Sequence, residues 1–432
     1  MAVTTALSAG QLAHIETALA ATDELLATAY PGDDGRRQPV HTVYVPADQF
    51  STALAADWGR AALDAAGGRD GLAALAGELG LGDPTRAGQL AGLVAAKLSA
   101  EPIEDLRLDF EDGYGARPDA EEDAAALAAG REVNAAVAAG TAPPFIGIRF
   151  KCFEAPTRAR GLRTLDLFIG SLVASGGLPD GLVLTLPKVT TVAQVEAMVY
   201  ACEQLEAAHS LPAGRLRFEV QVETPQLILA HDGTVPAAQL LHAGAGRVSS
   251  LHYGTYDYSA SLSIAAAYQS MDHPAADYAK NVLQVAVAGT GVHLSDGSTN
   301  ILPVGDPEQV SRAWALHARL VRRHLERGIY QGWDLHPAQL PTRFLATYAF
   351  YRDGFEAAAA RLRNYVHRYE SAIMDEPATA RALARFIHRG LACGALTDAE
   401  VLAATEISID QVTAIALARP VPNHPVTEDS HV

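Results

Sequence analysis

Acidic residues gather in three short stretches of this 432-residue chain that otherwise read as apolar strands. The stretch "RLDFEDGYG" holds Asp109, Glu111 and Asp112, "VETP" holds Glu223, and "GTYDY" holds Asp257. Carboxylates brought together repel one another unless a cation lies between them. A hard divalent ion such as Mg²⁺, which takes one or two carboxylates and keeps positions for substrate oxygens, resolves that repulsion. The alternative is structural ion pairing with the basic residues Arg107, Arg149 or Lys188.

Two basic residues end similar stretches, Arg149 in "GIRFK" and Lys188 in "TLPK". An arginine beside a metal site holds a carboxylate with two parallel hydrogen bonds, or stabilises an enolate oxygen as charge develops. Lys188 has a metal-free alternative, a Schiff base with a carbonyl substrate, but the surrounding acids favour a charged lysine. His336 fits either proton transfer or a structural hydrogen bond to the backbone.

The elements that must position these residues form a regular alternation. Strand-like segments recur at 41–48, 106–113, 145–151, 181–188, 217–225, 249–257, 290–296 and 330–337. Amphipathic helical patterns separate them, which predicts parallel strands joined by helical crossovers. Eight such units favour a closed (β/α)8 TIM barrel in the α/β class, with a doubly wound sheet as the competitor.

Barrel enzymes build their sites at the carboxyl ends of the strands, where the acids of this chain lie. Alternation along a strand places Arg107, Asp109 and Glu111 on the inward face, opposite Leu106, Leu108 and Phe110. The same rule turns Glu219, Gln221 and Glu223 inward on a later strand. We therefore expect Glu111, Asp112, Glu223 and Asp257 to meet at the mouth.

Three regions lie outside the eight units. Residues 1–40 predict a helical extension followed by the polar loop "PGDDGRRQP", and residues 49–105 predict a helical insertion within a catalytic barrel spanning 41–340. Residues 341–432 predict a carboxyl-terminal helical region that finishes in a polar, frayed tail. We interpret all three as additions to one barrel.

Composition narrows the class of protein. A net charge of -17 opposes binding to nucleic acid and to anionic membranes, although a local cation still admits an anionic small molecule. No run is long and apolar enough to span a membrane, and the start of the chain does not resemble a signal peptide, so we expect a cytoplasmic protein. The three isolated cysteines, Cys152, Cys202 and Cys393, indicate neither disulfides nor a zinc cluster.

Seven motifs, taken in order, resemble the strand-end signatures of the citrate lyase beta-subunit and malyl-CoA lyase family, the HpcH/HpaI aldolase superfamily. They are "VYVPAD", "LDFEDGYG", "IRFK", "LTLPKV", "VQVETP", "YGTYDYSASL" and "GWDLHPAQL". "DFED" and "YDYS" are also similar to malate synthases, which condense glyoxylate with acetyl-CoA. One departure is Lys151, which stands where the lyases usually carry an asparagine.

The resemblance implies a Mg²⁺-dependent barrel, with Mn²⁺ as a substitute, that makes or breaks a carbon–carbon bond next to a carbonyl. By the same resemblance Glu223 and Asp257 are the metal ligands and Arg149 holds the substrate carboxylate or enolate. Glu111 and Asp112 match the pair that orders metal-bound water. We further expect four residues to contact the substrate: Lys188, Thr224, Pro225 and His336.

We therefore expect a lyase or aldolase that acts on a 2-oxo acid such as pyruvate, oxaloacetate or glyoxylate, as a homo-oligomer. Three alternatives remain. They are a malate-synthase-like condensation with a CoA thioester, phosphoryl transfer on a phosphoenolpyruvate-type compound, and a barrel that has lost catalysis and serves as a binding scaffold.

Overall fold

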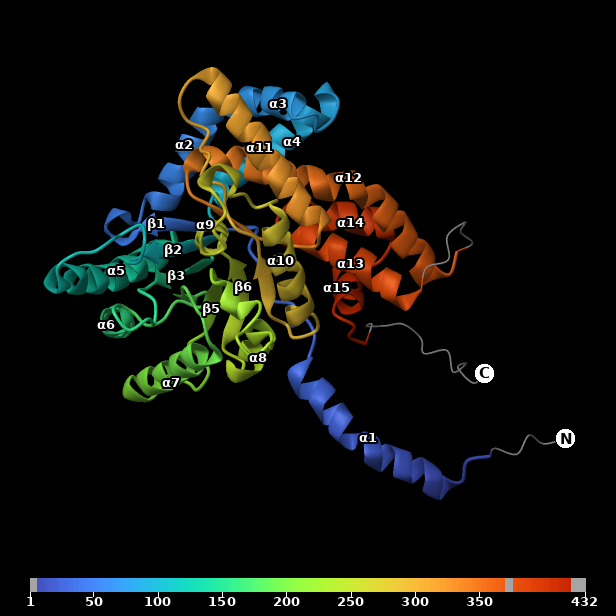
Figure 1. Ribbon diagram of the computed structural model, residues 1–432. Coiled ribbons are helices and arrows are strands. Elements are labelled where there is room, and N and C mark those ends of the chain that lie inside the picture. Colours follow the sequence, from blue (N-terminus) through green and yellow to red (C-terminus); the bar gives the residue numbers. More distant parts are fainter. Residues whose placement is uncertain (1–5, 370–375, 421–432) are drawn as a thin grey trace.

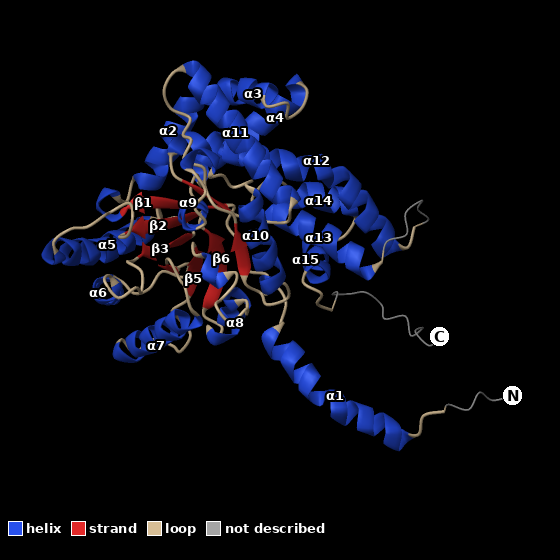
Figure 2. Ribbon diagram, in the orientation of Figure 1, coloured by secondary structure: helices blue, strands red, loops and turns tan. Residues whose placement is uncertain are grey.

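Eight parallel strands form the centre of the protein in the computed structural model, which describes residues 6–369 and 376–420 (Figures 1 and 2). The strands are β1 (His41–Pro46), β2 (Asp105–Asp109), β3 (Phe145–Arg149), β4 (Leu184–Leu186), β5 (Phe218–Val222), β6 (Val248–Tyr253), β7 (His293–Ser295) and β8 (Gly332–Asp334). From β1 to β7 each strand pairs with its neighbour in sequence, and β8 pairs with β1. A bridge between Ser295 and Gln331 joins β7 to the start of β8, so the sheet closes into a barrel.

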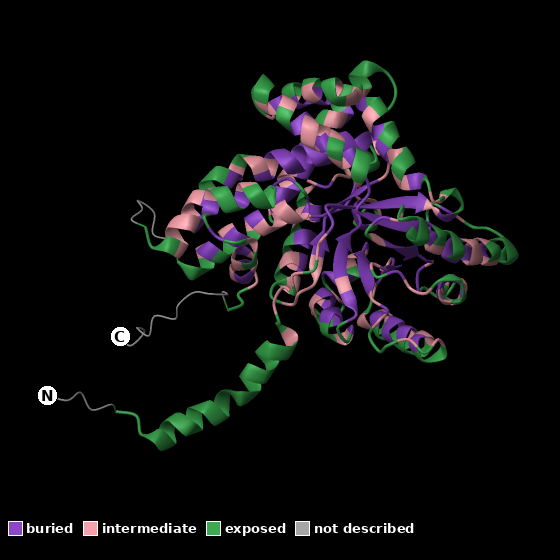
Figure 3. Ribbon diagram, turned by 180° about the vertical axis from the view of Figure 1, so that it is seen from behind, coloured by how far each residue is buried: buried purple, intermediate pink, exposed green. Residues whose placement is uncertain are grey.

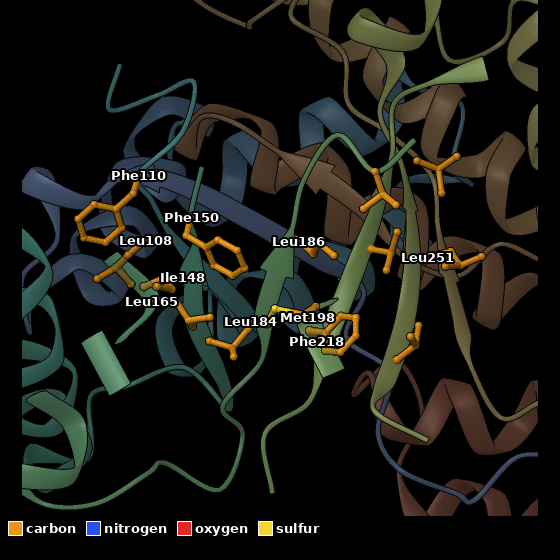
Figure 4. Packing of buried hydrophobic residues seen from close by; sticks show 14 of the residues in the cluster. Leu108, Phe110, Ile148, Phe150, Leu165, Leu184, Leu186, Met198, Phe218 and Leu251 are labelled. Carbon is orange, nitrogen blue, oxygen red and sulfur yellow. The ribbon is translucent and has the colours of Figure 1, made fainter. Parts of the chain in front are cut away.

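Alternation along the strands separates two environments. Outward residues such as Leu108, Ile148 and Phe218 pack with helix residues Leu165 and Met198 in one apolar cluster (Figure 4). Inward residues are polar and buried. A side-chain period of two thus places the apolar side chains under the helices and the charged ones inside the barrel, as predicted.

Helices follow the strands and cover the barrel. They are α5 (Asp119–Ala139), α6 (Arg158–Ser175), α7 (Val192–Ala208), α8 (Pro236–Ala243), α9 (Thr255–Ser261), α10 (Pro274–Val287), α11 (Pro307–Glu326) and α12 (Leu340–His367). Capping boxes fix the starts of two of them: Thr191 with Gln194 opens α7, and Asp306 with Gln309 opens α11. These crossovers satisfy the parallel pairing that the alternation predicted.

Further helices lie outside the barrel. α2 (Leu54–Ala66), α3 (Gly68–Glu78) and α4 (Pro84–Ala100) pack against α12 in a second apolar cluster. α13 (Pro377–Ala392), α14 (Asp398–Thr405) and α15 (Ile409–Ala416) pack on the other part of α12. α1 (Ala9–Ala29) projects from the body and buries none of its residues (Figure 3).

The (β/α)8 fold with additional terminal helices is therefore confirmed, and all eight predicted strands are present. The predicted strand at 181–188 is shorter than expected, since β4 covers only Leu184–Leu186. Pro187 cannot donate to a ladder, and Lys188 adopts a left-handed backbone with φ of 49°. The predicted frayed tail lies at 421–432, outside the described residues. No helix of the described ranges has the length and apolarity needed to cross a bilayer.

Candidate active site

Five consecutive strands end in charged side chains at the carboxyl end of the barrel. The residues are Glu111 and Asp112 after β2, Arg149 at the end of β3, Lys188 after β4, Glu223 after β5 and Asp257 in the first turn of α9 after β6. Parallel strands in register bring these ends to one rim. The structure thus brings together six of the nine residues that the sequence singled out for the site.

Lys188 lies at the centre of these acids. Its Nζ is 2.8 Å from Glu111 Oε1, 2.8 Å from Asp112 Oδ2 and 3.6 Å from Asp257 Oδ2. Burial alone would lower the pKa of Lys188, but Glu223, Glu111 and Asp112 outweigh it and raise that pKa. A lysine held in its charged form is a poor Schiff-base nucleophile. Lys188 itself supplies part of the positive charge that the sequence argument assigned to a metal.

The left-handed backbone of Lys188 has a local cause. Its N–H donates to Glu223 Oε2 at 3.0 Å, which ties the loop after β4 to the end of β5. The hydroxyl of Thr224 donates to the carbonyl of Val189 at 2.6 Å and makes a second tie. A non-glycine residue in this conformation is unfavourable and persists only where its surroundings hold it. The two strand ends are therefore fixed to each other.

Glu223 is buried, with only 3% of its surface exposed. Burial raises the pKa of its carboxyl to about 7, and the nearby Glu111 and Asp257 add to the shift, while Lys188 and Arg149 oppose it. Gly254 allows the carboxylate to lie here, because a Cβ at that position would be 2.3 Å from Glu223 Cγ. Glu223 thus carries a charge that the surrounding protein compensates only in part.

Asp109 orients Arg149. Its carboxylate accepts hydrogen bonds from Arg149 Nε at 2.7 Å and Nη2 at 2.6 Å, and also from the backbone N–H groups of Glu111 and Gly113. The guanidinium lies over the ring of Tyr44, with Cζ 4.8 Å from the ring centroid. Asp109 therefore fixes both the arginine and the loop that carries Glu111.

The third nitrogen of Arg149 remains turned toward the mouth. Nη1 is 3.5 Å from Glu111 Oε2 and 3.5 Å from the side-chain oxygen of Gln221, both weak contacts at that distance. A guanidinium whose other edge is held by a carboxylate keeps this nitrogen available for a substrate oxygen.

The donors present at the mouth fit a hard divalent ion. Glu111 Oε2 is buried and has no hydrogen-bond partner among the described residues, and the side chain of Asp257 is 47% exposed. No three His, Cys, Asp or Glu side chains of the described ranges are already grouped as ligands. Mg²⁺ needs only one or two carboxylates and fills its other positions with water. The pair Glu223 and Asp257, with a buried charge on the first that is compensated only in part, fits that requirement.

Deeper in the barrel the charges are paired with one another. Arg107 contacts Asp105 and donates from Nη2 to Glu219 Oε2 at 2.7 Å and from Nε to Thr185 Oγ1 at 3.0 Å. His252 Nε2 lies 3.1 Å from the same Glu219 oxygen. Burial would raise the pKa of Glu219, but Arg107 and His252 outweigh it and lower that pKa. For Arg107 the structural ion pair is therefore the correct interpretation.

Three other predicted residues make no hydrogen bond or ion pair with the charged side chains among the described residues. His336 Nδ1 accepts a hydrogen bond from the backbone N–H of Ala338 and so caps the short helix η4 (Pro337–Gln339). Pro225 opens the short helix η2 (Pro225–Leu227) below the rim. Thr224 acts through its bond to a backbone carbonyl.

Lys151, the departure from the family pattern, is turned toward the helices. Its Nζ donates to the carbonyl of Phe110 at 2.7 Å and to Glu122 Oε2 at 2.6 Å. Two contacts of Arg149 were not predicted. Gln221 was placed inward but was not connected with Arg149, and Tyr44 was missed, although alternation on its strand also places it inward.

The three cysteines are free and buried, as expected for core residues. Burial raises the pKa of Cys202 and of Cys393 to about 12, so both thiols stay protonated and unreactive at neutral pH.

Comparison with known proteins gives a fold relative and a family. No curated protein matches the sequence. Among solved structures, Haloferax volcanii malate synthase in a lead(II) complex has a TM-score of 0.50 at 15% identity, covering 89% of this chain and 89% of that one. An HpcH/HpaI aldolase/citrate lyase family protein from Burkholderia cenocepacia J2315 has a TM-score of 0.38 at 14% identity, covering 70% of this chain and 90% of that one. At such identity the first likeness shows a shared fold. The model of one protein family matches residues 19–420, and the chain therefore belongs to that family, a domain of unknown function (DUF6986).

Proposed function

We propose that this protein is a metal-dependent enzyme that makes or breaks a carbon–carbon bond next to the carbonyl of a 2-oxo acid. The observation that carries the proposal is the group of acids at the mouth of the barrel. Glu111, Asp112 and Asp257 lie within 3.6 Å of the Lys188 ammonium, Glu223 accepts from the Lys188 backbone N–H, and the Nη1 of Arg149 makes only two weak contacts of 3.5 Å. Glu223 and Asp257 would hold Mg²⁺ or Mn²⁺. The bound ion supplies a Lewis acid that stabilises negative charge on a substrate oxygen.

Residues of the chain itself would bind the substrate, position Arg149 and keep Lys188 charged. Arg149 holds the substrate carboxylate, or the oxygen on which charge develops, through the nitrogen that Asp109 leaves free. Asp109 is a positioning residue, since it acts only through Arg149. Glu111 and Asp112 keep Lys188 charged and directed into the mouth.

The lyase direction is the first candidate, because the acid and arginine arrangement suits cleavage that leaves an enolate. Condensation with a CoA thioester is the second. The likeness to Haloferax volcanii malate synthase supports it, since the match covers 89% of each chain and so extends past the barrel into the added helices. The two directions share the charged residues at the mouth and differ in the second substrate.

The test is an assay of the purified protein with Mg²⁺. One arm incubates acetyl-CoA with glyoxylate and measures free thiol, and the other measures 2-oxo acid released from hydroxy acids. Asp257→Asn should lose Mg²⁺ affinity and turnover, whereas Asp166→Asn, the same change at an exposed position on α6, should lose neither. Full activity in excess EDTA would contradict the proposal, and so would an Asp257→Asn variant that retains activity. Release of phosphate from phosphoenolpyruvate would replace it with phosphoryl transfer.

A further inference from the structure

A cavity of about 350 Å³ opens at the other end of the barrel, where the strands begin. Its wall combines the loop before β1 with residues at the starts of β3, β4 and β5, among them Pro39, Phe145, Leu182, Arg215 and Arg217. Arg107 and Glu219 form its floor. The cavity therefore lies below the paired charges of the barrel interior, on the opposite side from the candidate active site.

Two arginines of this cavity form no ion pair with a carboxylate of the described residues. The Nε of Arg217 is buried without a hydrogen-bond partner, and among the described residues its side chain makes no ion pair. Arg215 donates only to backbone carbonyls, those of Leu178 and Pro179. The hydroxyl of Ser249 is a second buried polar group in the wall that has no described partner. Half-buried cations and unpartnered donors are costly unless an acceptor reaches them.

The other arginines around the cavity are already paired with carboxylates. Arg37 pairs with Glu104 at 2.9 Å, and Arg36 pairs with the exposed Asp34 at 3.0 Å. Arg107 is saturated by Asp105 and Glu219. Asp180 also lines the cavity, is exposed and forms no ion pair among the described residues, so one unpaired carboxylate stands against the two arginines. The charge left inside the cavity is thus positive, in a chain whose net charge is -17.

We propose that this cavity is a second ligand site, which binds a small organic anion through Arg215 and Arg217. A carboxylate or phosphate group would accept from the two guanidinium groups, and Ser249 would donate a further hydrogen bond. The apolar part of the ligand would lie against Pro39, Phe145 and Leu182. The volume falls at the lower end of the roughly 300–1,000 Å³ typical of small-molecule sites. Neither the metal nor the substrate of the proposed reaction is needed here.

Calorimetric titration of the full chain with inorganic phosphate, and separately with succinate, tests the proposal and distinguishes the two anion chemistries. For whichever of the two anions binds to the wild type, Arg217→Met should lower the affinity by roughly 10- to 100-fold, the effect of losing one charge-assisted hydrogen bond. Arg312→Met, the same change at an exposed arginine on α11, should leave the affinity unchanged. Glu223→Gln should also leave it unchanged, which separates this site from the mouth.

Two outcomes would overturn the proposal. One is the absence of heat with both anions at millimolar concentration, and the other is equal affinity in the wild type and Arg217→Met. Arg217 makes no described contact that its loss would break, so the variant should fold. Arg217→Gln, checked by its thermal midpoint, provides a second variant of similar size that must also lose affinity.

Discussion

At the carboxyl end of the barrel three carboxylates lie within 3.6 Å of one ammonium and a fourth, Glu223, is buried beside them, whereas at the amino end two guanidinium groups form no ion pair among the described residues. The interior between them differs from both, since Arg107, Asp105, Glu219 and His252 pair with one another. Buried charge is tolerated where it is paired. Among the described residues that line the barrel, charge that is left partly uncompensated lies at the two ends, which supports a cation site at one end and an anion site at the other.

The two ends are connected by hydrogen bonds through the interior. Tyr44 donates to Glu219 Oε1 at 3.1 Å and accepts from Gln221 Nε2 at 3.1 Å. Gln221 in turn lies beside Arg149 at the mouth. The paired interior separates two sites of opposite charge and also contacts both, so substitutions there and at each end should have distinct effects.

The largest effect should come from Arg107→Met in the interior. The change leaves Asp105 and Glu219 buried without their cation, and breaking a buried pair in this way costs about 3–5 kcal/mol. The unfolding free energy from denaturant titration should fall by that amount. Arg312→Met on the surface should change it by less than about 0.5 kcal/mol. Equal stability of the two variants would show that the interior pairs do not hold the barrel together.

Arg149→Met should have the next largest effect, and it should be specific to the carboxyl end. Loss of a donor aimed at developing negative charge costs roughly 10²–10³ in kcat, about 2.7–4 kcal/mol. The measurement is kcat in the Mg²⁺-dependent assay. Anion binding at the amino end, measured by calorimetry, should be unchanged. If Arg149→Met kept its kcat and lost anion binding, the assignment of the two ends would be reversed.

Glu223→Gln tests the unpaired negative charge directly. Because the folded-state pKa of about 7 exceeds the unfolded value near 4.5, the wild type loses stability as pH rises through this window. At pH 8 without divalent ions the variant should be more stable than the wild type, by about 3 kcal/mol. At pH 5 the two should be alike. Mg²⁺ should raise the thermal midpoint of the wild type and leave that of the variant unchanged.

The sequence was sufficient for the barrel and for the residues at its mouth. Eight strand-like segments of period two, each followed by a helical pattern, constrain the topology, and the fold fixes which strand ends meet. Glu111, Arg149, Lys188 and Glu223 could be placed together on that basis. Contacts could not be derived in the same way, because they depend on distances across the barrel.

Lys188 and Arg217 illustrate that limit. The sequence placed Lys188 at a strand end, but only the fold shows its Nζ between Glu111 and Asp112. Arg217 is the first residue of the predicted strand at 217–225, and the sequence assigned it no role. Its lack of a partner among the described residues is a property of the whole amino end of the barrel, which is assembled from β2, β3, β5, β6 and β7, the residues just before β4 and β8, and the loop before β1. No local sequence pattern could have predicted that the Arg217 side chain has no partner among the described residues.

The smallest expected effect concerns His293, in the wall of the amino-end cavity. Burial, aided by Arg389, lowers its pKa to about 4, against the opposing influence of Asp33 and Asp34. The unfolded chain then binds a proton below about pH 6.5 that the folded chain does not, so stability falls as pH falls from 6.5 toward 4, by about 1 kcal/mol per pH unit. His293→Asn should remove this slope, measured as the unfolding free energy at pH 7 and 5.5.

The sign of this pH dependence is opposite to that of Glu223. A buried base lowers the stability of the protein in acid, whereas a buried acid lowers it in base. A slope unchanged in His293→Asn would mean that other histidines carry the acid sensitivity, and the contrast between the two ends would then rest on their arginines and carboxylates alone.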